Sequence, residues 1–265
     1  MRLLLESAKP LSLEELGLTG RNLEIILKNI KKTYGMMLVT GPTGSGKTTT
    51  LYSILSILNS PDSKLCTVED PIEYGIPRIT QIQINPQTGL TFASGLRSLL
   101  RHDPDIVMVG EIRDKETAEI AIHSALTGHL VLSTLHTNDA PSAIPRFLDL
   151  GAEPCLVSST VNVVIAQRLV RKLCPYCKKA FVPPPDLAKE LLQLIGSSAP
   201  EIFQTSFFQS RGCLKCGGTG YSGRMAVYEI FEMDEELKDL VLKKEPADQL
   251  KKEALKKGMI TMIRD

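Results

Sequence analysis

A glycine-rich segment near the start of the chain has the residue types and the spacing of a phosphate-binding loop. It fits the pattern Gly-x-x-x-x-Gly-Lys-Thr, follows an apolar run at 36–40 and precedes a run with helical character. Glycines let successive main-chain N–H groups converge on phosphate oxygens, and the following helix directs its positive end at the anion. The nucleotide-binding residues are expected to be Gly41, Pro42, Thr43, Gly44, Ser45, Gly46, Lys47, Thr48 and Thr49.

Two side chains of this loop and a later glutamate predict how a nucleotide and a metal ion are held. Lys47 is expected to bridge the β- and γ-phosphates of ATP, and the Thr48 hydroxyl to coordinate Mg²⁺. The apolar run 105–109 is followed by Gly110, where Asp is common in such proteins, and then by Glu111. A carboxylate at that strand end can hold Mg²⁺ through water or orient the attacking water. An ordinary surface glutamate is the alternative.

The cysteines indicate a second metal site. Four of the six lie in two Cys-x-x-Cys pairs with 35 residues between the pairs. They are Cys174, Cys177, Cys213 and Cys216. Four thiolates suit tetrahedral Zn²⁺, so we predict a closed, structural zinc site. Disulfides and a redox or regulatory role are the alternatives. The two remaining cysteines, Cys66 and Cys155, are expected to be small hydrophobic core residues.

Short apolar runs alternate with helical patterns over the first 170 residues or so. Buried strands are expected at 36–40, 64–68, 105–109 and 129–135. Helices are expected at 48–58, 91–100, 114–126, 141–150 and 155–167. Asp114 is the candidate N-cap of the third helix, and Gly128 lies just past its end. Alternation of this kind predicts an α/β fold with a mostly parallel sheet covered on both sides.

The composition changes after Gln167. The later segment holds both cysteine pairs, a run of prolines and many glycines, and a variable insertion is expected near 183–208. A strand at 225–231 and charged helices at about 235–243 and 247–257 complete the chain. We therefore predict three parts: a P-loop ATPase domain at 1–170, a tetracysteine zinc subdomain at 171–225, and a C-terminal part at 226–265.

Composition limits the classes of partner. The chain has 43% hydrophobic and 23% charged residues and a formal net charge of +1, so global charge indicates neither nucleic acid nor an anionic membrane. No apolar run reaches the roughly 18–20 residues of a membrane span, and the first residues lack the apolar core of a signal peptide. We expect a cytosolic protein that reaches a membrane only through partners.

Three further motifs make the assignment more specific. Residues 67–74 follow a core strand and carry three carboxylates, which would repel one another unless a cation or proton relieves them. This stretch resembles the Asp box of the bacterial ATPases that power type II secretion and type IV pilus assembly. Residues 95–105 with 110–114 look like that family's Walker B region, and 127–139 look like its His box. The resemblance runs from about residue 10 to the end.

The resemblance implies a RecA-like P-loop fold and a role for each carboxylate. Glu73 would polarise the attacking water and Glu111 would hold Mg²⁺ through water. This division stays open, because both carboxylates could reach the same water. Glu69 and Asp70 would support them.

Histidines and arginines of the same motifs also receive roles from the resemblance. His136 would sense the γ-phosphate, whereas His129 either acts there or only braces its turn. Arg97 and Arg101, one helical turn apart, would neutralise phosphate charge, within one subunit or across a subunit boundary, or serve as structural ion-pair partners. Arg113 has the same two alternatives.

The resemblance also implies partners. Family members work as rings, usually hexameric, and act on an inner-membrane platform protein from the cytoplasm. A tetracysteine element is typical of assembly and export ATPases and not of retraction ATPases. Family members carry an N-terminal domain before the P-loop domain, and only about 40 residues precede the loop here. We therefore expect a truncated chain that hydrolyses ATP weakly alone.

Other classes of protein remain as alternatives. A nucleic-acid-dependent ATPase of the recombinase or helicase kind shares the P-loop, but it should show a basic or aromatic strand-binding stripe. This chain has 5% aromatic residues and no Trp. A GTPase switch should carry an Asn-Lys-x-Asp element, which the sequence lacks. A small-molecule kinase is a further alternative, which only the P-loop supports.

Overall fold

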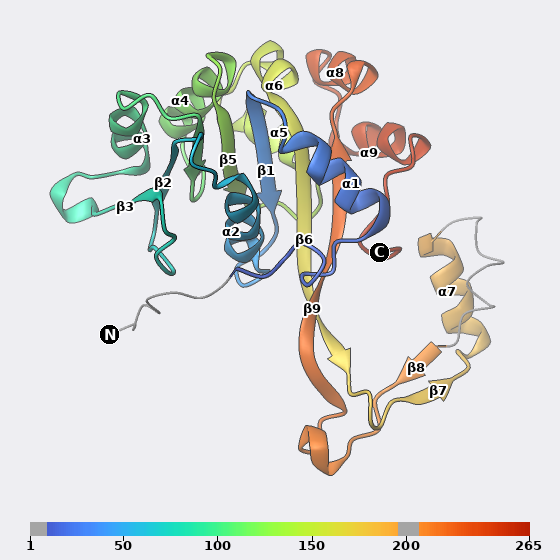
Figure 1. Ribbon diagram of the computed structural model, residues 1–265. Coiled ribbons are helices and arrows are strands. Elements are labelled where there is room, and N and C mark those ends of the chain that lie inside the picture. Colours follow the sequence, from blue (N-terminus) through green and yellow to red (C-terminus); the bar gives the residue numbers. More distant parts are fainter. Residues whose placement is uncertain (1–9, 196–206) are drawn as a thin grey trace.

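The computed structural model describes residues 10–195 and 207–265, and its centre is a seven-stranded sheet (Figure 1). The strand order is β3-β2-β4-β5-β1-β6-β9. The strands are β1 (Gly35–Thr40), β2 (Leu65–Glu69), β3 (Ile79–Gln83), β4 (Ile106–Val109), β5 (Leu130–Leu135), β6 (Val161–Leu173) and β9 (Tyr221–Glu232). Within this sheet β9 is antiparallel to β6, and the other neighbours are parallel. The predicted α/β fold with a mostly parallel sheet is confirmed.

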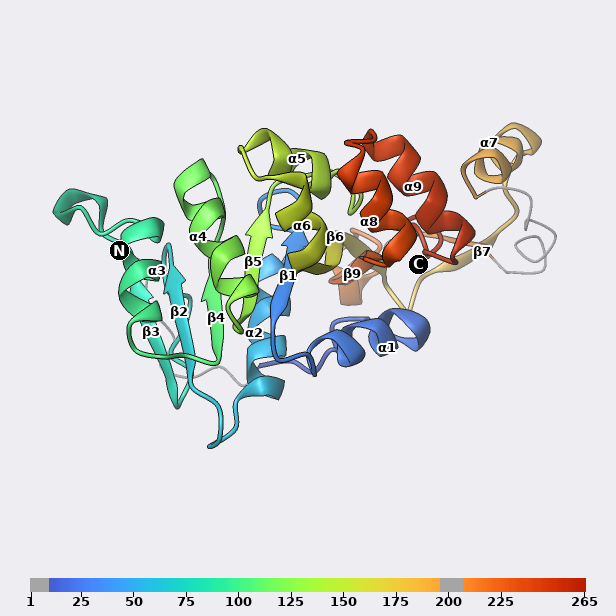
Figure 2. The ribbon, with the colours of Figure 1, turned by 90° about the horizontal axis from the view of Figure 1, so that it is seen from above.

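Helices cover both faces of the sheet (Figure 2). On one face lie α1 (Gly20–Asn29) and α2 (Lys47–Leu58). On the other lie α3 (Phe92–Leu100), α4 (Lys115–Leu126), α5 (Ala143–Asp149), α6 (Pro154–Thr160), α8 (Glu235–Leu242) and α9 (Ala247–Lys256). Successive strand side chains point to opposite faces, so Met36 and Leu38 of β1 join one core while Met37 and Val39 join the other. This double burial explains why the central strands are continuous apolar runs.

Most of the expected elements form within one or two residues of their predicted bounds. The expected N-cap of α4 is present, because Asp114 Oδ1 accepts a hydrogen bond from the Thr117 N–H at 2.8 Å. The C-terminal strand and both charged helices also form, as β9, α8 and α9. Local signals were sufficient for these elements.

The helix expected at 155–167 is wrong. Only residues 154–160 are helical, as α6, and β6 begins at Val161. The run Val161-Asn-Val-Val-Ile165 is rich in β-branched residues, which favour a strand. Pairing with β1 on one side and β9 on the other then makes it an internal strand of the sheet. The edge strand β3 and the helix α1 were not predicted.

β6 and β9 continue beyond the sheet as a two-stranded ribbon (Figure 1). Their pairing runs from Val163 with Glu232 to Leu173 with Tyr221, where the ribbon meets the tetracysteine cluster. A small hairpin of β7 (Lys179–Phe181) and β8 (Phe207–Gln209) follows, together with α7 (Pro185–Ile195). We call residues 168–182 and 207–225 the arm. No helix in the described ranges is apolar and long enough to cross a bilayer.

Candidate nucleotide site and candidate metal centre

The glycine-rich loop connects the carboxyl end of β1 with the start of α2. Gly41 has φ 145°, and a Cβ there would lie 2.4 Å from the Gln167 carbonyl oxygen, so only glycine fits. Gly46, with φ 88°, sits at the N-cap of α2, and no side chain caps that end of the helix. The first N–H groups of α2 are therefore available to an anion.

Polar groups in the loop fit a phosphate ligand. Ser45 is 3% exposed, and its hydroxyl oxygen has no hydrogen-bond partner in the structure. Lys47 Nζ donates to the carbonyl oxygens of Gly41, at 3.0 Å, and Pro42, at 3.2 Å. Burial lowers the pKa of Lys47, and the charge of Glu111 opposes that shift. The Thr48 hydroxyl lies in the first turn of α2 and is half-buried, while Thr49 beside it is exposed.

Gln167 on β6 braces this loop, and the sequence analysis missed it. Its Nε2 donates to the Ser45 carbonyl oxygen at 2.8 Å, and its Oε1 accepts from the Thr50 hydroxyl at 2.7 Å. Gln167 is 2% exposed. The available signal is a lone amide after an apolar, β-branched run, but a helix predicted at 155–167 gives this amide no place beside the loop. Buried amides of this kind need partners, and here the phosphate-binding loop supplies one and α2 the other.

Glu111 lies next to His136, at the carboxyl ends of the neighbouring strands β4 and β5. The Glu111 side chain is 11% exposed, Oε2 is 2.5 Å from Arg113 Nε, and His136 Nε2 is 3.3 Å from the same oxygen. The His136 segment is tied to β1, because the Thr137 N–H donates to Thr40 Oγ1 at 2.8 Å. The carboxyl edge of a parallel sheet is where such folds bind ligands, and three motifs meet there.

The acidic segment after β2 is attached to α2 through Tyr52. Tyr52 Oη donates a short hydrogen bond to Glu69. Glu69, which is 2% exposed, also accepts from Thr67 Oγ1 at 2.6 Å and from Gln81 Nε2 at 3.0 Å. The Glu73 N–H donates to Tyr52 Oη at 3.3 Å. Burial, followed by the hydrogen bond to Glu69, raises the pKa of Tyr52. Glu69 is thus a buried anchor, while the half-buried Glu73 sits beside the helix that starts at the phosphate loop.

The arginines of α3 contact surface groups in this structure. Arg97 Nη2 is 2.7 Å from Glu116 Oε1 of α4, and both side chains are exposed. Arg101 donates to the Arg97 carbonyl oxygen and to Ser98 Oγ of its own helix. His129 Nδ1 lies 3.0 Å from the Ser124 carbonyl oxygen at the end of α4. The two arginines thus contact α3 and α4, and His129 contacts the end of α4, whereas Glu111 and His136 contact each other after two neighbouring strands.

The four paired cysteines converge at the end of the arm. Their Sγ atoms all lie within 4.8 Å of one another, and none of the six cysteines forms a disulfide. Three separations are 4.0 Å (Cys174–Cys213), 3.9 Å (Cys177–Cys216) and 3.7 Å (Cys213–Cys216). Zinc–sulfur bonds of about 2.3 Å in a tetrahedron put sulfur atoms about 3.8 Å apart, so the cluster fits Zn²⁺.

Main-chain donors support a thiolate in this cluster. The N–H groups of Cys213 and Gly220 each donate to Cys216 Sγ at 3.2 Å. Burial raises the pKa of Cys216, but these donors outweigh it and lower that pKa to about 6. A thiolate is the form that binds a metal.

The two cysteines outside the cluster differ from each other. Cys66 on β2 is buried, as expected, but Cys155 is exposed, so its assignment to the core was wrong. Cys155 lies in the first turn of α6, whose buried positions are Val157, Ser158 and Thr160. An apolar neighbourhood in the sequence therefore did not reveal which side of this short helix faces the core.

Comparison with known proteins relates the chain to secretion and pilus ATPases. The type IV pilus assembly ATPase PilB of Myxococcus xanthus is 49% identical over 262 residues, which are 99% of this chain and 46% of that relative. The type II secretion system ATPase E of Vibrio cholerae is 50% identical over 241 residues, 91% of this chain and 47% of the relative. The chain thus spans about half the length of these two relatives.

A solved structure supports the same relationship. The pilus retraction motor PilT with bound ADP matches with a TM-score of 0.64 and 30% identity, covering 98% of this chain and 66% of the other. The family model described as type II/IV secretion system protein matches residues 1–265. Since that match extends over every residue of the sequence, this chain belongs to the type II/IV secretion system protein family.

Proposed function

We propose that this chain is the Mg²⁺-dependent, ATP-hydrolysing part of a motor for type IV pilus assembly or type II secretion. One observation carries the proposal: the phosphate loop after β1, Glu111 after β4 and His136 after β5 meet at one edge of the sheet. Loop, carboxylate and histidine are the groups needed to hold a triphosphate and to respond to its terminal phosphate.

Each residue of the site has a proposed task. Lys47 exchanges the loop carbonyls for the β- and γ-phosphates, and the Ser45 hydroxyl and the α2 N–H groups complete the cradle. Thr48 and, through water, Glu111 would hold Mg²⁺, which would neutralise phosphate charge when bound. The Glu73 carboxylate orients the attacking water. His136 reports the γ-phosphate to the loop that follows β5.

The geometry suggests how the two glutamates divide their work. Glu111 is already oriented by Arg113 and His136, which suits a fixed role beside the metal. Glu73 lies on a loop whose main chain is attached to α2, so movement of the phosphate loop can carry it. We propose Glu73 as the group nearer the water on this basis.

Assembly and location are also proposals. We infer a homo-oligomer, most simply a hexameric ring, in the cytoplasm at the inner membrane. Its partners would be a platform protein and an N-terminal domain of the same family, with no nucleic acid. Arg97 could serve a neighbouring subunit's nucleotide only after it leaves Glu116, and Arg101 only after it leaves the Arg97 carbonyl and Ser98. We further propose that the parts 1–170, 171–225 and 226–265 have separate roles, although β6 crosses the first boundary and β9 the second.

The proposal is tested by Glu111→Gln in the purified chain and in a longer protein that includes the N-terminal domain. We expect ATP binding to persist and phosphate release to fall by about a hundredfold or more, since Mg²⁺ contributes several kcal/mol of charge stabilisation in the transition state and Glu111 is the carboxylate proposed to hold it. The matched control is Glu119→Gln, an exposed glutamate of α4 that pairs with Lys115. Unchanged turnover in Glu111→Gln would remove Glu111 from the mechanism, and absence of ATP binding by the unmodified protein would end the proposal.

A further inference from the structure

The strand β9 carries a buried glutamate that the proposed mechanism does not use. Glu229 is 2% exposed and stands between Tyr228 and Ile230, whose side chains pack on the opposite face of the sheet. By the alternation of a strand, its own side chain points to the same face as that of Phe231, the face that α8 and α9 cover. A buried carboxylate is costly unless polar groups satisfy it, so its partners are informative.

The main partner of Glu229 belongs to the loop after β5 that carries His136. The Ala140 N–H donates to Glu229 Oε1 at 3.0 Å, and Ala140 is fully buried. Near the start of this loop, the Thr137 N–H donates to Oγ1 of Thr40, the residue before the phosphate loop. The loop is therefore fixed at two points, one on β1 and one on β9.

A lysine of α9 adds a charged contact to the same loop. Lys251 Nζ is 3.2 Å from Asp139 Oδ2, and both side chains are half-buried. Asp139 Oδ1 also accepts from the Ser142 N–H at 3.1 Å. Burial raises the pKa of Glu229, while the hydrogen bond from Ala140 and the charge of Lys251 oppose the rise. Lys251 thus stands near two carboxylates, one on the loop and one on β9.

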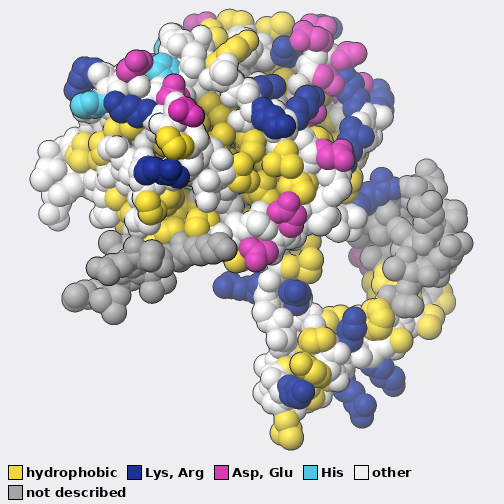
Figure 3. All heavy atoms as spheres, viewed as in Figure 1, with side chains coloured by type: hydrophobic (Ala, Val, Ile, Leu, Met, Phe, Trp, Pro, Cys, Tyr) yellow, Lys and Arg dark blue, Asp and Glu magenta, His cyan; other side chains and the backbone are white. Residues whose placement is uncertain are grey.

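The pair between Lys251 and Asp139 differs from the ion pairs of the surrounding surface. Figure 3 shows acidic and basic side chains intermixed over α8 and α9, at the upper right. Pairs such as Lys256 with Glu253 remain within one helix, whereas Lys251 connects α9 with the loop after β5. Ion pairs near a surface contribute little to stability, so the place of this pair points to a different role.

We propose that Glu229 and Lys251 are positioning residues that hold His136 in place for the γ-phosphate. The His136 side chain is 47% exposed, so its direction depends on the main chain that carries it. An anchor at Thr137 alone would leave the rest of the loop free to turn, and a second anchor at Ala140 fixes its direction. Misplacement of a reacting group by about 1 Å can cost a hundredfold in rate. The inference rests on the proposed function, which assigns the γ-phosphate to His136.

The test compares the affinities of the chain for ADP and for a non-hydrolysable ATP analogue, both with Mg²⁺. Glu229→Ala should lower the preference for the analogue by about tenfold and leave ADP affinity unchanged, because His136 is assigned to the γ-phosphate alone. Glu229→Gln keeps an acceptor for the Ala140 N–H and should recover most of this preference. Lys251→Met should lower it by about threefold. Lys251 is half-buried on a helix, so this variant tests the proposal even if Glu229→Ala does not fold.

A double-mutant cycle separates positioning from stability. Glu229→Ala should add nothing in a chain that already carries His136→Ala, because both changes remove the same contact with the nucleotide. A further loss in the double variant would overturn the proposal, as would a fall in ADP affinity equal to the fall for the analogue. If His136→Ala leaves the preference unchanged, this inference fails, while the Glu111→Gln experiment still decides the proposed function.

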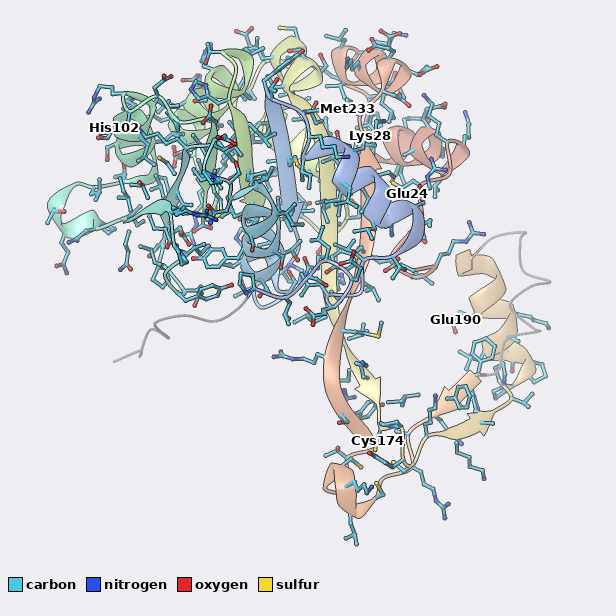
Figure 4. All side chains as sticks on the ribbon, in the orientation of Figure 1. Glu24, Lys28, His102, Cys174, Glu190 and Met233 are labelled. Carbon is cyan, nitrogen blue, oxygen red and sulfur yellow. The ribbon has the colours of Figure 1, made fainter. Side chains whose placement is uncertain are left out.

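The matched controls are a glutamate and a lysine of the same two elements. Glu232→Ala removes a carboxylate of β9 that pairs with Lys28 of α1, which is labelled in Figure 4. Lys256→Met removes a cation of α9 that pairs with Glu253. Both variants should retain the nucleotide preference of the unmodified chain. Equal losses in the controls and in Glu229→Ala would overturn the positioning role.

Discussion

The phosphate loop and the arm share the strand β6 but are stabilised in different ways. The first seven residues of β6 lie almost entirely within the sheet, and its last six are exposed or half-buried. Gln167, at the end of the buried part, is held by hydrogen bonds to the phosphate loop. Cys174, just past the exposed part, belongs to the four-thiol cluster. One strand is therefore fixed at one end by packing, and its other end adjoins a four-cysteine cluster that fits a metal ion.

The difference shows where apolar packing is enough to stabilise the backbone and where a cysteine cluster is needed. Around the loop, two apolar clusters on opposite faces of the sheet supply enough burial to fix the backbone. The end of the arm has no comparable core, since Leu214, Tyr176 and Val182 are exposed there. Small elements without a core usually depend on metals or disulfides. The comparison predicts that damage to one region leaves the other largely intact.

Loss of the metal should have the largest effect. A chelator, or Cys216→Ser, should unfold the end of the arm while the sheet persists, because structural zinc contributes on the order of 10 kcal/mol to such sites. Zinc content and protease cleavage within the arm measure this. Cys155→Ser changes an exposed thiol outside the cluster, so it should alter neither the zinc content nor the protease cleavage of the arm. The comparison fails if the metal-free chain resists proteolysis as well as the metal-bound one, or loses nucleotide affinity.

Gln167→Leu should have the next largest effect. It should lower the stability of the seven-stranded sheet and its phosphate loop without affecting the arm. It leaves the Ser45 carbonyl and the Thr50 hydroxyl without their partner, which costs about 1–3 kcal/mol of unfolding free energy. Nucleotide affinity should fall by about tenfold while zinc content stays constant. Denaturant unfolding and nucleotide titration check this. Arg168→Leu, at the next and exposed position, is the control, and an equal loss there would refute the bracing role.

Tyr52→Phe should have the smallest effect and separates positioning from stability. Removing the hydroxyl takes a donor from Glu69 and an acceptor from the Glu73 N–H, at a cost of about 1 kcal/mol or somewhat more. Turnover should fall by several-fold with ATP affinity unchanged. Ser158→Ala is the control, because it removes a buried hydroxyl that donates to the Cys155 carbonyl oxygen within α6, outside the site. Similar turnover losses in both variants would indicate a general effect of stability.

Elements with local signals were predictable from the sequence. The phosphate loop depends on glycines that fix its own backbone, and α4 on a cap three residues from its partner. The cysteine pairs needed only their spacing to indicate a cluster. By contrast, 155–167 has apolar residues compatible with either helix or strand, and pairing with β1 and β9 decided in favour of the strand from Val161 onwards.

The sequence by itself determined the residue types for phosphate, metal and thiolate chemistry, since each motif is a short stretch with its own spacing. Tertiary structure decided which distant side chains complete them. Gln167 is 122 residues from Ser45 and Tyr52 is 17 from Glu69, so neither partnership has a local signature. The eight basic residues of the arm lie in two segments distant in sequence, 168–182 and 207–225, and the pairing of β6 with β9 brings these segments together. Side-chain contacts between distant segments arise from sheet register and packing, which no short window of sequence contains.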